Sequence, residues 1–321
     1  MSKRFVDYTP TELTRLSKKD FLDGIRAAEG RTVSAFVCPR AANYVEKVSN
    51  IELVASFGAD LICIEGFDPH KLQMPGLPSK DKADDAPYKK DAQLEMGFGW
   101  SLQEMKKFVG RPMGIVLLVP DFEGQDYGPL YGESVYSPAM LRHLIDEGYD
   151  YVSLCAMNQE KLLNVVKEAS QIGGDKIVIS AGIPHGPGAI VDENFPPYNL
   201  RDLVTPEYLK ELAAAGADIV GIPSVGVVPG FAIEHASQLA DAIHSQKSLV
   251  DVSIAHSIEG TDEATLCRIA IDNRIAGADL FTLAAGGVFE SVTLPEALLA
   301  FCIALKGKRH TYRRMCQSSF R

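Results

Sequence analysis

Short runs rich in Val, Ile and Leu alternate along the chain with segments whose apolar residues recur at helical spacing. Four of these runs follow the same short pattern, a glycine, one further residue and an aspartate, which begins at Gly58, Gly148, Gly216 and Gly277. The glycine suits the left-handed cap of a helix, and the apolar run after it suits a strand buried on both faces. The repeated pattern therefore predicts a series of helix and strand pairs.

Four further apolar runs, at 32–40, 112–120, 176–184 and 249–256, raise the number of expected strands to eight. The helices between the strands have recognisable starts. Ser49 and Ser101 each precede a glutamate by three residues, as in a capping box, while Ser137 and Thr205 each stand directly before a proline. Eight strands that alternate with helices predict a single α/β domain, a closed (β/α)8 TIM barrel, in preference to an open doubly wound sheet.

The rest of the chain is organised around the expected barrel at 32–305. Residues 1–31 predict an N-terminal helical extension, and residues 306–321 form a C-terminal tail with six basic and no acidic side chains. We expect the tail to be solvated, the alternative being contact with an acidic neighbour. The connections at 67–99 and 185–203, after the second and fifth strands, are long for a barrel and suggest lids or, equally, subunit contacts in a homo-oligomer.

Composition and charge exclude several classes of protein. Of the 321 residues, 46% are apolar and 23% are charged, as in an ordinary globular protein. The net charge of −10 argues against nucleic acid as a partner. No apolar stretch is long enough for a membrane span and no secretory signal is found, so we expect a cytoplasmic protein. The six cysteines include no Cys-x-x-Cys pair, and no strand leads into a Gly-x-Gly-x-x-Gly motif, so nothing indicates a zinc site, a nucleotide or a flavin.

Candidate catalytic residues stand at the carboxyl ends of the expected strands, where barrels of this kind carry their reactive groups. Glu65 ends the second strand and would enter the barrel mouth with little water around it, which suits proton transfer. His185 and His256 close the fifth and seventh strands and can also move protons. The alternatives are a structural pair between Glu65 and Arg40 and ordinary hydrogen-bonded histidines.

Two further groups of residues suggest ligand binding. Asp121 and Glu123 follow the third strand, and paired carboxylates suit Mg²⁺, although loop acids also form turns. Gly286 and Gly287, after the eighth strand, expose backbone N–H groups that could hold a phosphate, with Ser257 and Gly260 contributing. The remaining polar groups that we expect to bind the substrate are Arg40, Asn158 and Ser224.

Residues 112–128, which contain Asp121-Phe-Glu123-Gly and then Tyr127-Gly128, resemble the phosphoenolpyruvate mutase and isocitrate lyase group. In that group an N-terminal helix precedes the barrel, and acids spaced Asp-x-Asp before Gly-Tyr-Gly hold magnesium. The resemblance implies that Asp121 and Glu123 are metal-linked acids. Glutamate replaces the second aspartate here, residues are inserted before Tyr127, and the Lys-Lys-Cys-Gly-His catalytic loop of that group is absent.

These features predict an enzyme that acts on a small anionic metabolite, phosphorylated or carboxylated. The expected reaction is that of a lyase or isomerase with proton transfer next to a carbonyl, assisted by magnesium. No lysine ends a strand, which disfavours a Schiff-base aldolase. Two alternatives stay open: a single-metal hydrolase with Glu65, His185 and His256 as ligands, and a barrel without catalysis that serves in binding or assembly.

Overall fold

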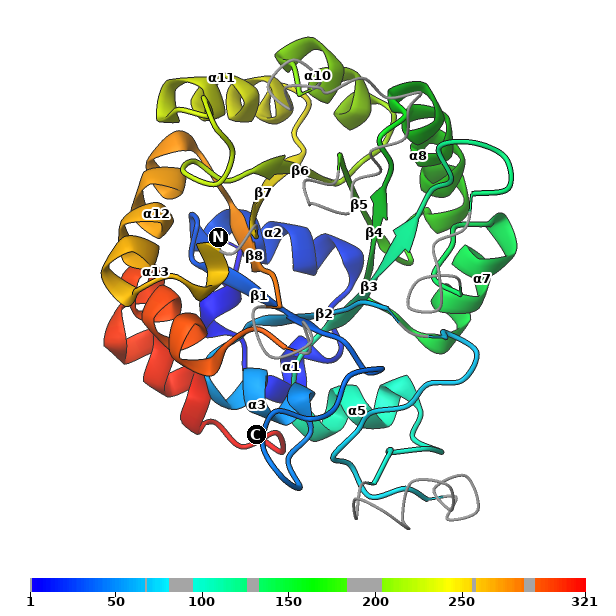
Figure 1. Ribbon diagram of the computed structural model, residues 1–321, viewed down its shortest axis with the longest axis vertical. Coiled ribbons are helices and arrows are strands. Elements are labelled where there is room, and N and C mark those ends of the chain that lie inside the picture. Colours follow the sequence, from blue (N-terminus) through cyan, green and yellow to red (C-terminus); the bar gives the residue numbers. More distant parts are fainter. Residues whose placement is uncertain are drawn as a thin grey trace.

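A ring of parallel strands forms the centre of the molecule (Figure 1). The computed structural model describes residues 2–66, 68–80, 95–125, 133–183, 204–255, 258–285 and 292–321. Eight strands pair in chain order and close into a barrel, so the predicted (β/α)8 barrel is confirmed. The strands are β1 (Thr32–Val37), β2 (Leu61–Ile64), β3 (Met113–Leu118), β4 (Tyr151–Cys155), β5 (Val178–Gly182), β6 (Ile219–Pro223), β7 (Leu249–Ile254) and β8 (Leu280–Leu283).

Helices surround the ring and precede it. Before β1 lie η1 (Phe5–Asp7), α1 (Pro10–Leu13) and α2 (Lys18–Ala28). Around the barrel lie α3 (Asn50–Ser56), α5 (Leu102–Val109), α7 (Pro138–Glu147), α8 (Gln159–Gly173), α10 (Pro206–Ala214), α11 (Ile233–His244), η2 (Ile258–Gly260), α12 (Glu263–Ala276) and α13 (Pro295–Cys316). Over the described ranges, none of the helices has both the length and the apolar character that crossing a bilayer requires.

The predicted helix starts are confirmed at four positions. Ser49 and Ser101 form capping boxes with the glutamates three residues later. Ser137 and Thr205 accept a backbone N–H with their side chains, and a proline follows each of them. These starts depend on contacts within a few residues, which is why local sequence was enough to predict them.

The glycine and aspartate pattern marks the amino ends of alternate strands. The glycine of each repeat has a positive φ, between 86° and 113°. Each aspartate makes two hydrogen bonds to one residue of the preceding strand. Its side chain accepts the backbone N–H of that residue at 2.8–3.0 Å, and its own backbone N–H donates to the carbonyl of that residue. The pairs are Asp60 with Val33, Asp150 with Met113, Asp218 with Ile179, and Asp279 with Val250. Each repeat therefore links one strand to the next by hydrogen bonds at the amino-terminal end of the barrel, opposite the expected site.

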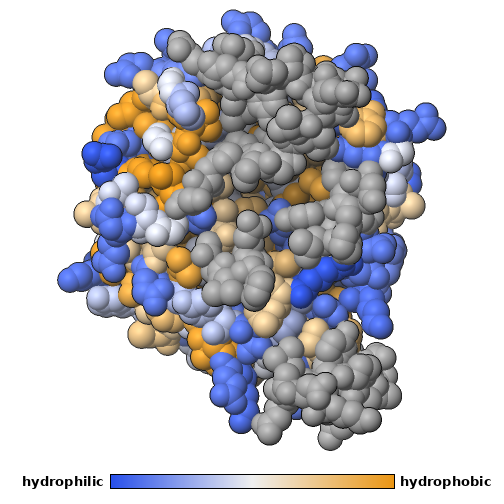
Figure 2. Space-filling model, viewed as in Figure 1, coloured by the Kyte–Doolittle hydropathy of each residue, from blue (hydrophilic) through white to orange (hydrophobic). Residues whose placement is uncertain are grey.

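Strand residues alternate between two separate cores. One set packs outward against the helices. On the face that Figure 2 draws, hydrophilic residues gather along the rim, and an apolar area lies between α11 and α12. The other set, which includes Leu61, Tyr151 and Leu249, points into the barrel and packs with Phe5 and Phe21 of the N-terminal segment. Figure 1 shows α2 across one end of the ring. The amino-terminal end of the barrel is therefore closed by apolar side chains.

The C-terminal segment differs from the expected solvated tail. It continues α13 as far as Cys316, and the predicted boundary at 305/306 falls inside this helix, next to the non-helical Gly307. Lys306 and Arg314 are buried, and both pair with the fully buried Asp60, at 2.7 and 2.9 Å. The expectation of solvation is wrong for these two side chains because a buried carboxylate neutralises their charge.

Candidate active site

Some strand residues that point into the barrel keep part of their surface accessible, although helices cover the outer faces of the same strands. They belong to five strands and are Phe36, Leu118, Ser153, Cys155, Gly221, Asp251 and Ser253. The amino-terminal end of the barrel is closed, so this surface faces the carboxyl ends of the strands. These partly accessible residues line the carboxyl-terminal part of the barrel interior, which we call the central hollow.

The central hollow exists because small and polar side chains stand where barrels of this class usually carry bulky branched ones. The hydroxyls of Ser34, Ser180 and Thr282 point inward and are almost completely buried. Gly182 and Gly221 are register partners in β5 and β6, and a Cβ atom on Gly182 would come 3.1 Å from the carbonyl oxygen of Gly221. The backbones of β5 and β6 therefore approach too closely for a side chain at Gly182, whereas a Cβ at Gly221 would make only ordinary contacts, the nearest at 3.7 Å.

The aromatic ring of Tyr151 fills the barrel below the central hollow. It lies over Gly114, where an added Cβ would stand only 2.4 Å from ring atoms. The hydroxyl oxygen of Tyr151 is 3.4 Å from Oγ of Ser34. Burial, together with the neighbouring thiol of Cys63, raises the pKa of Tyr151 well above its ordinary value, so the phenol is neutral.

Glu65 lies at the mouth of the barrel, directly after the last residue of β2. Its backbone N–H donates to the carbonyl of Val37 at 3.0 Å, which continues the pairing with β1. Burial raises the pKa of the thiols of Cys38, Cys63 and Cys155, the last to about 12, and the negative charge of Glu65 raises all three further. The carboxylate is thus close to three inward thiols, which are protonated at neutral pH.

Arg40 lies on the same side of the mouth, in the turn after β1. The Cys38 thiol donates a hydrogen bond to the Gly66 carbonyl at 3.8 Å, and the backbone N–H groups of Arg40 and Ala41 lower its pKa. The positive charge of Arg40 lowers the pKa of this thiol, whereas the negative charge of Glu65 raises it. Both predicted residues therefore act on one thiol, so the structure brings Arg40 and Glu65 together around Cys38.

Asp251, in the middle of β7, was missed by the sequence reasoning. Its Oδ2 accepts the hydroxyl of Thr282 at 2.8 Å, while Oδ1 is closed off from solvent and has no hydrogen-bond partner. Burial raises the pKa of Asp251 to about 7, against the opposing hydrogen bonds from Thr282 and the Val252 N–H. The alternation of residues 249–254 indicates that Asp251 points into the barrel, but the predicted catalytic residues were all at strand ends.

Asp121 joins two loops at the mouth. Its Oδ1 accepts the backbone N–H of Asn158 at 2.6 Å, and Asn158 caps α8 by accepting the N–H of Lys161. Glu123, the second predicted metal ligand, is exposed. Within the described ranges, no three His, Cys, Asp or Glu side chains gather in a way that could hold a metal ion. Magnesium at Asp121 and Glu123 therefore stays a prediction.

The remaining predicted residues divide into two groups. Ser224 is completely buried; its hydroxyl donates to the Val225 carbonyl and accepts from Nδ2 of Asn273 on α12, so it fastens a loop and offers no surface to a ligand. Gly260 is exposed in η2, where an added Cβ would lie 4.0 Å from a side-chain carbon of Leu294. The other predicted residues, His185, His256, Ser257, Gly286 and Gly287, lie outside the described residues.

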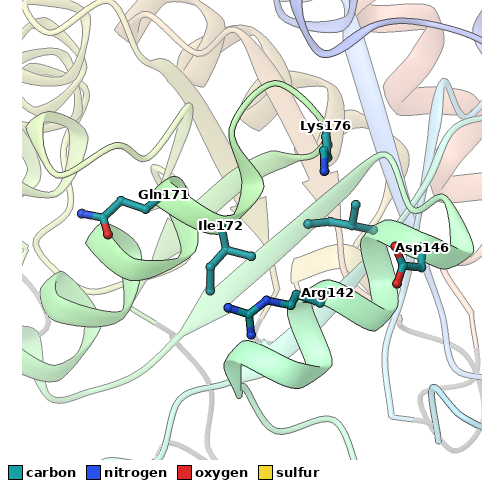
Figure 3. A pocket seen from close by; sticks show the side chains of 6 residues that line it. Arg142, Asp146, Gln171, Ile172 and Lys176 are labelled. Atoms are coloured by element: carbon teal, nitrogen blue, oxygen red, sulfur yellow. The ribbon is translucent and has the colours of Figure 1, made fainter.

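A separate pocket of about 420 Å³ lies between α7 and α8 (Figure 3). It is lined by Arg142, Ile145, Asp146, Gln171, Ile172 and Lys176. These residues belong to the C-terminal halves of the two helices and to the segment before β5, so the pocket lies toward the amino ends of the strands. The central hollow is the better candidate because reactive groups in such barrels gather at the carboxyl ends.

A family model matches residues 6–321, almost the whole chain, and carries the description "Domain of unknown function (DUF7916)". The chain belongs to the DUF7916 family. No functionally curated protein matches the sequence.

Several solved structures align with this DUF7916 chain along most of its length. A tryptophan synthase structure from Mycobacterium tuberculosis is 15% identical, with a TM-score of 0.48, and the match covers 90% of this chain and 98% of that one. A putative fructose-1,6-biphosphate aldolase from Coccidioides immitis is 13% identical, with a TM-score of 0.46 and coverage of 92% and 97%. Deoxyribose phosphate aldolase from Aeropyrum pernix is 12% identical, with a TM-score of 0.42 and coverage of 89% and 94%. Such low identities and scores say nothing about the reaction.

Proposed function

We propose that this protein is a lyase or isomerase that moves a proton at the carbon next to a carbonyl group of a small carboxylated or phosphorylated metabolite. The central hollow is the observation that carries the proposal. A barrel with a purely structural role gains packing energy by filling its interior with bulky apolar side chains. Apolar side chains fill the closed end of this barrel, but toward the other end small and polar residues leave part of the inner surface accessible, and a carboxylate, Glu65, lies at the mouth. A bound substrate accounts for both features.

Glu65 is the group that takes and returns the proton. The C–H bond breaks, its proton goes to the Glu65 carboxylate, and its electron pair forms the enolate with the carbonyl. Return of the proton at a neighbouring atom completes an isomerisation. In a lyase reaction the enolate electrons instead form a C=C bond to the β-carbon, and a leaving group departs from that carbon with its bonding electrons. Arg40 binds the anionic end of the substrate, with Gly286 and Gly287 as the predicted phosphate turn. No step depends on magnesium, and His185 and His256 keep their predicted roles in proton transfer.

Solvent isotope exchange tests the reaction class without knowledge of the product. The protein is incubated in D2O with pyruvate, 2-oxoglutarate or dihydroxyacetone phosphate, and proton NMR follows the loss of the C–H signal next to the carbonyl. The wild-type protein should catalyse exchange with at least one probe. Glu65→Gln should lower the rate by about 10²–10⁴-fold, the usual contribution of a general base. Glu46→Gln, at an exposed position, is the matched control and should exchange normally.

Two results would contradict the proposal. If the wild-type protein exchanges no probe, proton transfer next to a carbonyl is not its chemistry. If Glu65→Gln keeps the full rate, Glu65 is not the base. Elemental analysis of protein purified without added metal distinguishes the hydrolase alternative from the lyase or isomerase. One zinc or manganese ion per protein molecule would favour a hydrolase with Glu65, His185 and His256 as metal ligands.

Filling the central hollow provides an independent test. A Cβ atom at Gly221 would meet nothing closer than the Cα of Gly182 at 3.7 Å and the carbonyl oxygen of Ala181 at 3.8 Å. Gly221→Ala should therefore fold and keep its activity, whereas the longer side chain of Gly221→Leu should occupy the hollow and abolish exchange at an unchanged unfolding temperature. Full exchange by a folded leucine variant would show that the substrate binds elsewhere.

A further inference from the structure

We propose that Asp251 is the second catalytic group of this site: it is a neutral acid in the free enzyme and donates its proton to the substrate carbonyl oxygen while Glu65 deprotonates the adjoining carbon. The inference rests on the proposed function and deepens it, because it assigns the acid that acts opposite the base. Asp251 is the third residue of the six-residue strand β7, so it lies deeper in the barrel than Glu65, which follows the end of β2.

The geometry around Asp251 leaves one side of the carboxyl group without a protein partner. Its Oδ2 is held by the Thr282 hydroxyl on β8, whereas Oδ1 has no hydrogen bond and no contact with solvent. Its register partner on β6 is Gly221, which has no side chain to approach it. An ionised carboxylate with an unpaired buried oxygen is costly. Asp251 as a whole still keeps part of its surface accessible in the barrel interior, so its protonated carboxyl group can serve as a donor to a ligand bound there.

Among the described residues, the titratable groups that interact with Asp251 are Cys63 on β2 and Tyr151 and Cys155 on β4. The pKa of each of these groups is raised, so none of them supplies a positive charge. Other strands contribute uncharged positions, namely Ser34, Gly114, Ser180, Gly221 and Thr282. Burial accordingly raises the pKa of Asp251 to about 7, more than the hydrogen bonds from Thr282 and Val252 lower it. The neutral acid is therefore well populated at neutral pH.

Two carboxyl groups in opposite ionisation states form a working acid and base pair. The O–H bond of Asp251 breaks and its proton goes to the carbonyl oxygen, while the C–H proton goes to the Glu65 carboxylate. The C–H electron pair becomes the C=C bond of an enol, and the carbonyl π pair becomes the new O–H bond. Asp251 ends as a carboxylate, Glu65 ends as an acid, and the reverse transfers restore both. The substrate oxygen ends as a neutral hydroxyl, so the enol avoids the full negative charge that an enolate would carry.

An infrared titration tests the ionisation of Asp251 in the free protein. The C=O stretching band of a protonated carboxylic acid should disappear with a midpoint near pH 7, the value to which burial raises the pKa of this group. The band should be missing in Asp251→Asn, which keeps the size of the side chain and an acceptor for Thr282. Asp175→Asn, at an exposed position, should leave the band unchanged. A band that persists in Asp251→Asn, or a wild-type protein that lacks one at pH 6, would overturn the inference.

Deuterium exchange with the probe that the wild-type protein turns over tests the catalytic role. Asp251→Asn should lower the rate by about 10²–10⁴-fold and remove the fall in rate above pH 7. An unchanged rate and pH profile in this variant would show that Asp251 is not the acid, even if Glu65→Gln is inactive. If the wild-type protein exchanges no probe, the proposed function and the catalytic role of Asp251 both fail, while the infrared titration still decides the ionisation.

Discussion

Neutralising Asp60 should destabilise the protein far more than neutralising an equivalent aspartate of the same repeat. Asp60 is completely buried at the closed end of the barrel, where it contacts Nζ of Lys306 at 2.7 Å and Nε of Arg314 at 2.9 Å. Burial alone would raise the pKa of Asp60, but the two cations outweigh it and lower the pKa below the ordinary 3.8. The stabilisation is therefore fully present above about pH 4 and is lost at lower pH.

The magnitude follows from the burial of the partners. Asp60→Asn keeps the shape of the side chain and an acceptor for the Val33 N–H. It removes the negative charge and the second acceptor, so its NH2 group faces the Arg314 donor. Lys306 and Arg314, which are 1% and 2% exposed at their side chains, then remain buried without a counter-charge. Breaking a buried ionic cluster in this way costs about 3–5 kcal/mol, which in a protein of this size lowers the unfolding temperature by roughly 6–15 °C.

Asp279→Asn is the matched control. Asp279 also accepts a strand N–H, that of Val250 at 2.8 Å, but its partner His244 is 40% exposed at the side chain. An exposed pair contributes at most about 1 kcal/mol, so this variant should unfold within a few degrees of wild type. Urea titration and thermal unfolding, followed by circular dichroism, measure both variants. Equal losses for Asp60→Asn and Asp279→Asn would refute the reasoning from burial.

Three further predictions concern the barrel interior and pH. The folded state holds the Asp251 proton more tightly than the unfolded state, so the free energy of unfolding should fall between about pH 4 and pH 7. The fall should be at most about 4 kcal/mol, and urea titrations of Asp251→Asn should not show it. Gly114→Ala should cost about 1–3 kcal/mol in urea unfolding, because the new methyl group meets the Tyr151 ring; an unchanged midpoint would contradict the packing. The hydrogen bond to Asp279 raises the pKa of His244, so His244→Gln should lose less than about 1 kcal/mol below pH 6.5 and nothing at high pH; a loss that grows with pH would reverse the sign.

The candidate site was only partly accessible from the sequence. Glu65 and Arg40 were found because they end strands, and strand ends can be located from the apolar runs. Asp251 was not found, because its raised pKa comes from burial inside the closed barrel, and that burial depends on residues far apart in the sequence. Ser224 was assigned to the site from its place at a strand end, but its hydroxyl is tied to Asn273, a residue 49 positions away.

The sequence by itself determined the order and number of the strands, the helix starts and the closed barrel, since all of these follow from local periodicity, caps and the count of repeats. Only the tertiary structure decided that part of the barrel interior stays accessible and that Asp60 neutralises residues 246 and 254 positions further along the chain. The physical reason is that hydrogen bonds within a turn depend on neighbouring residues, whereas burial and electrostatic balance depend on every group that the fold brings near.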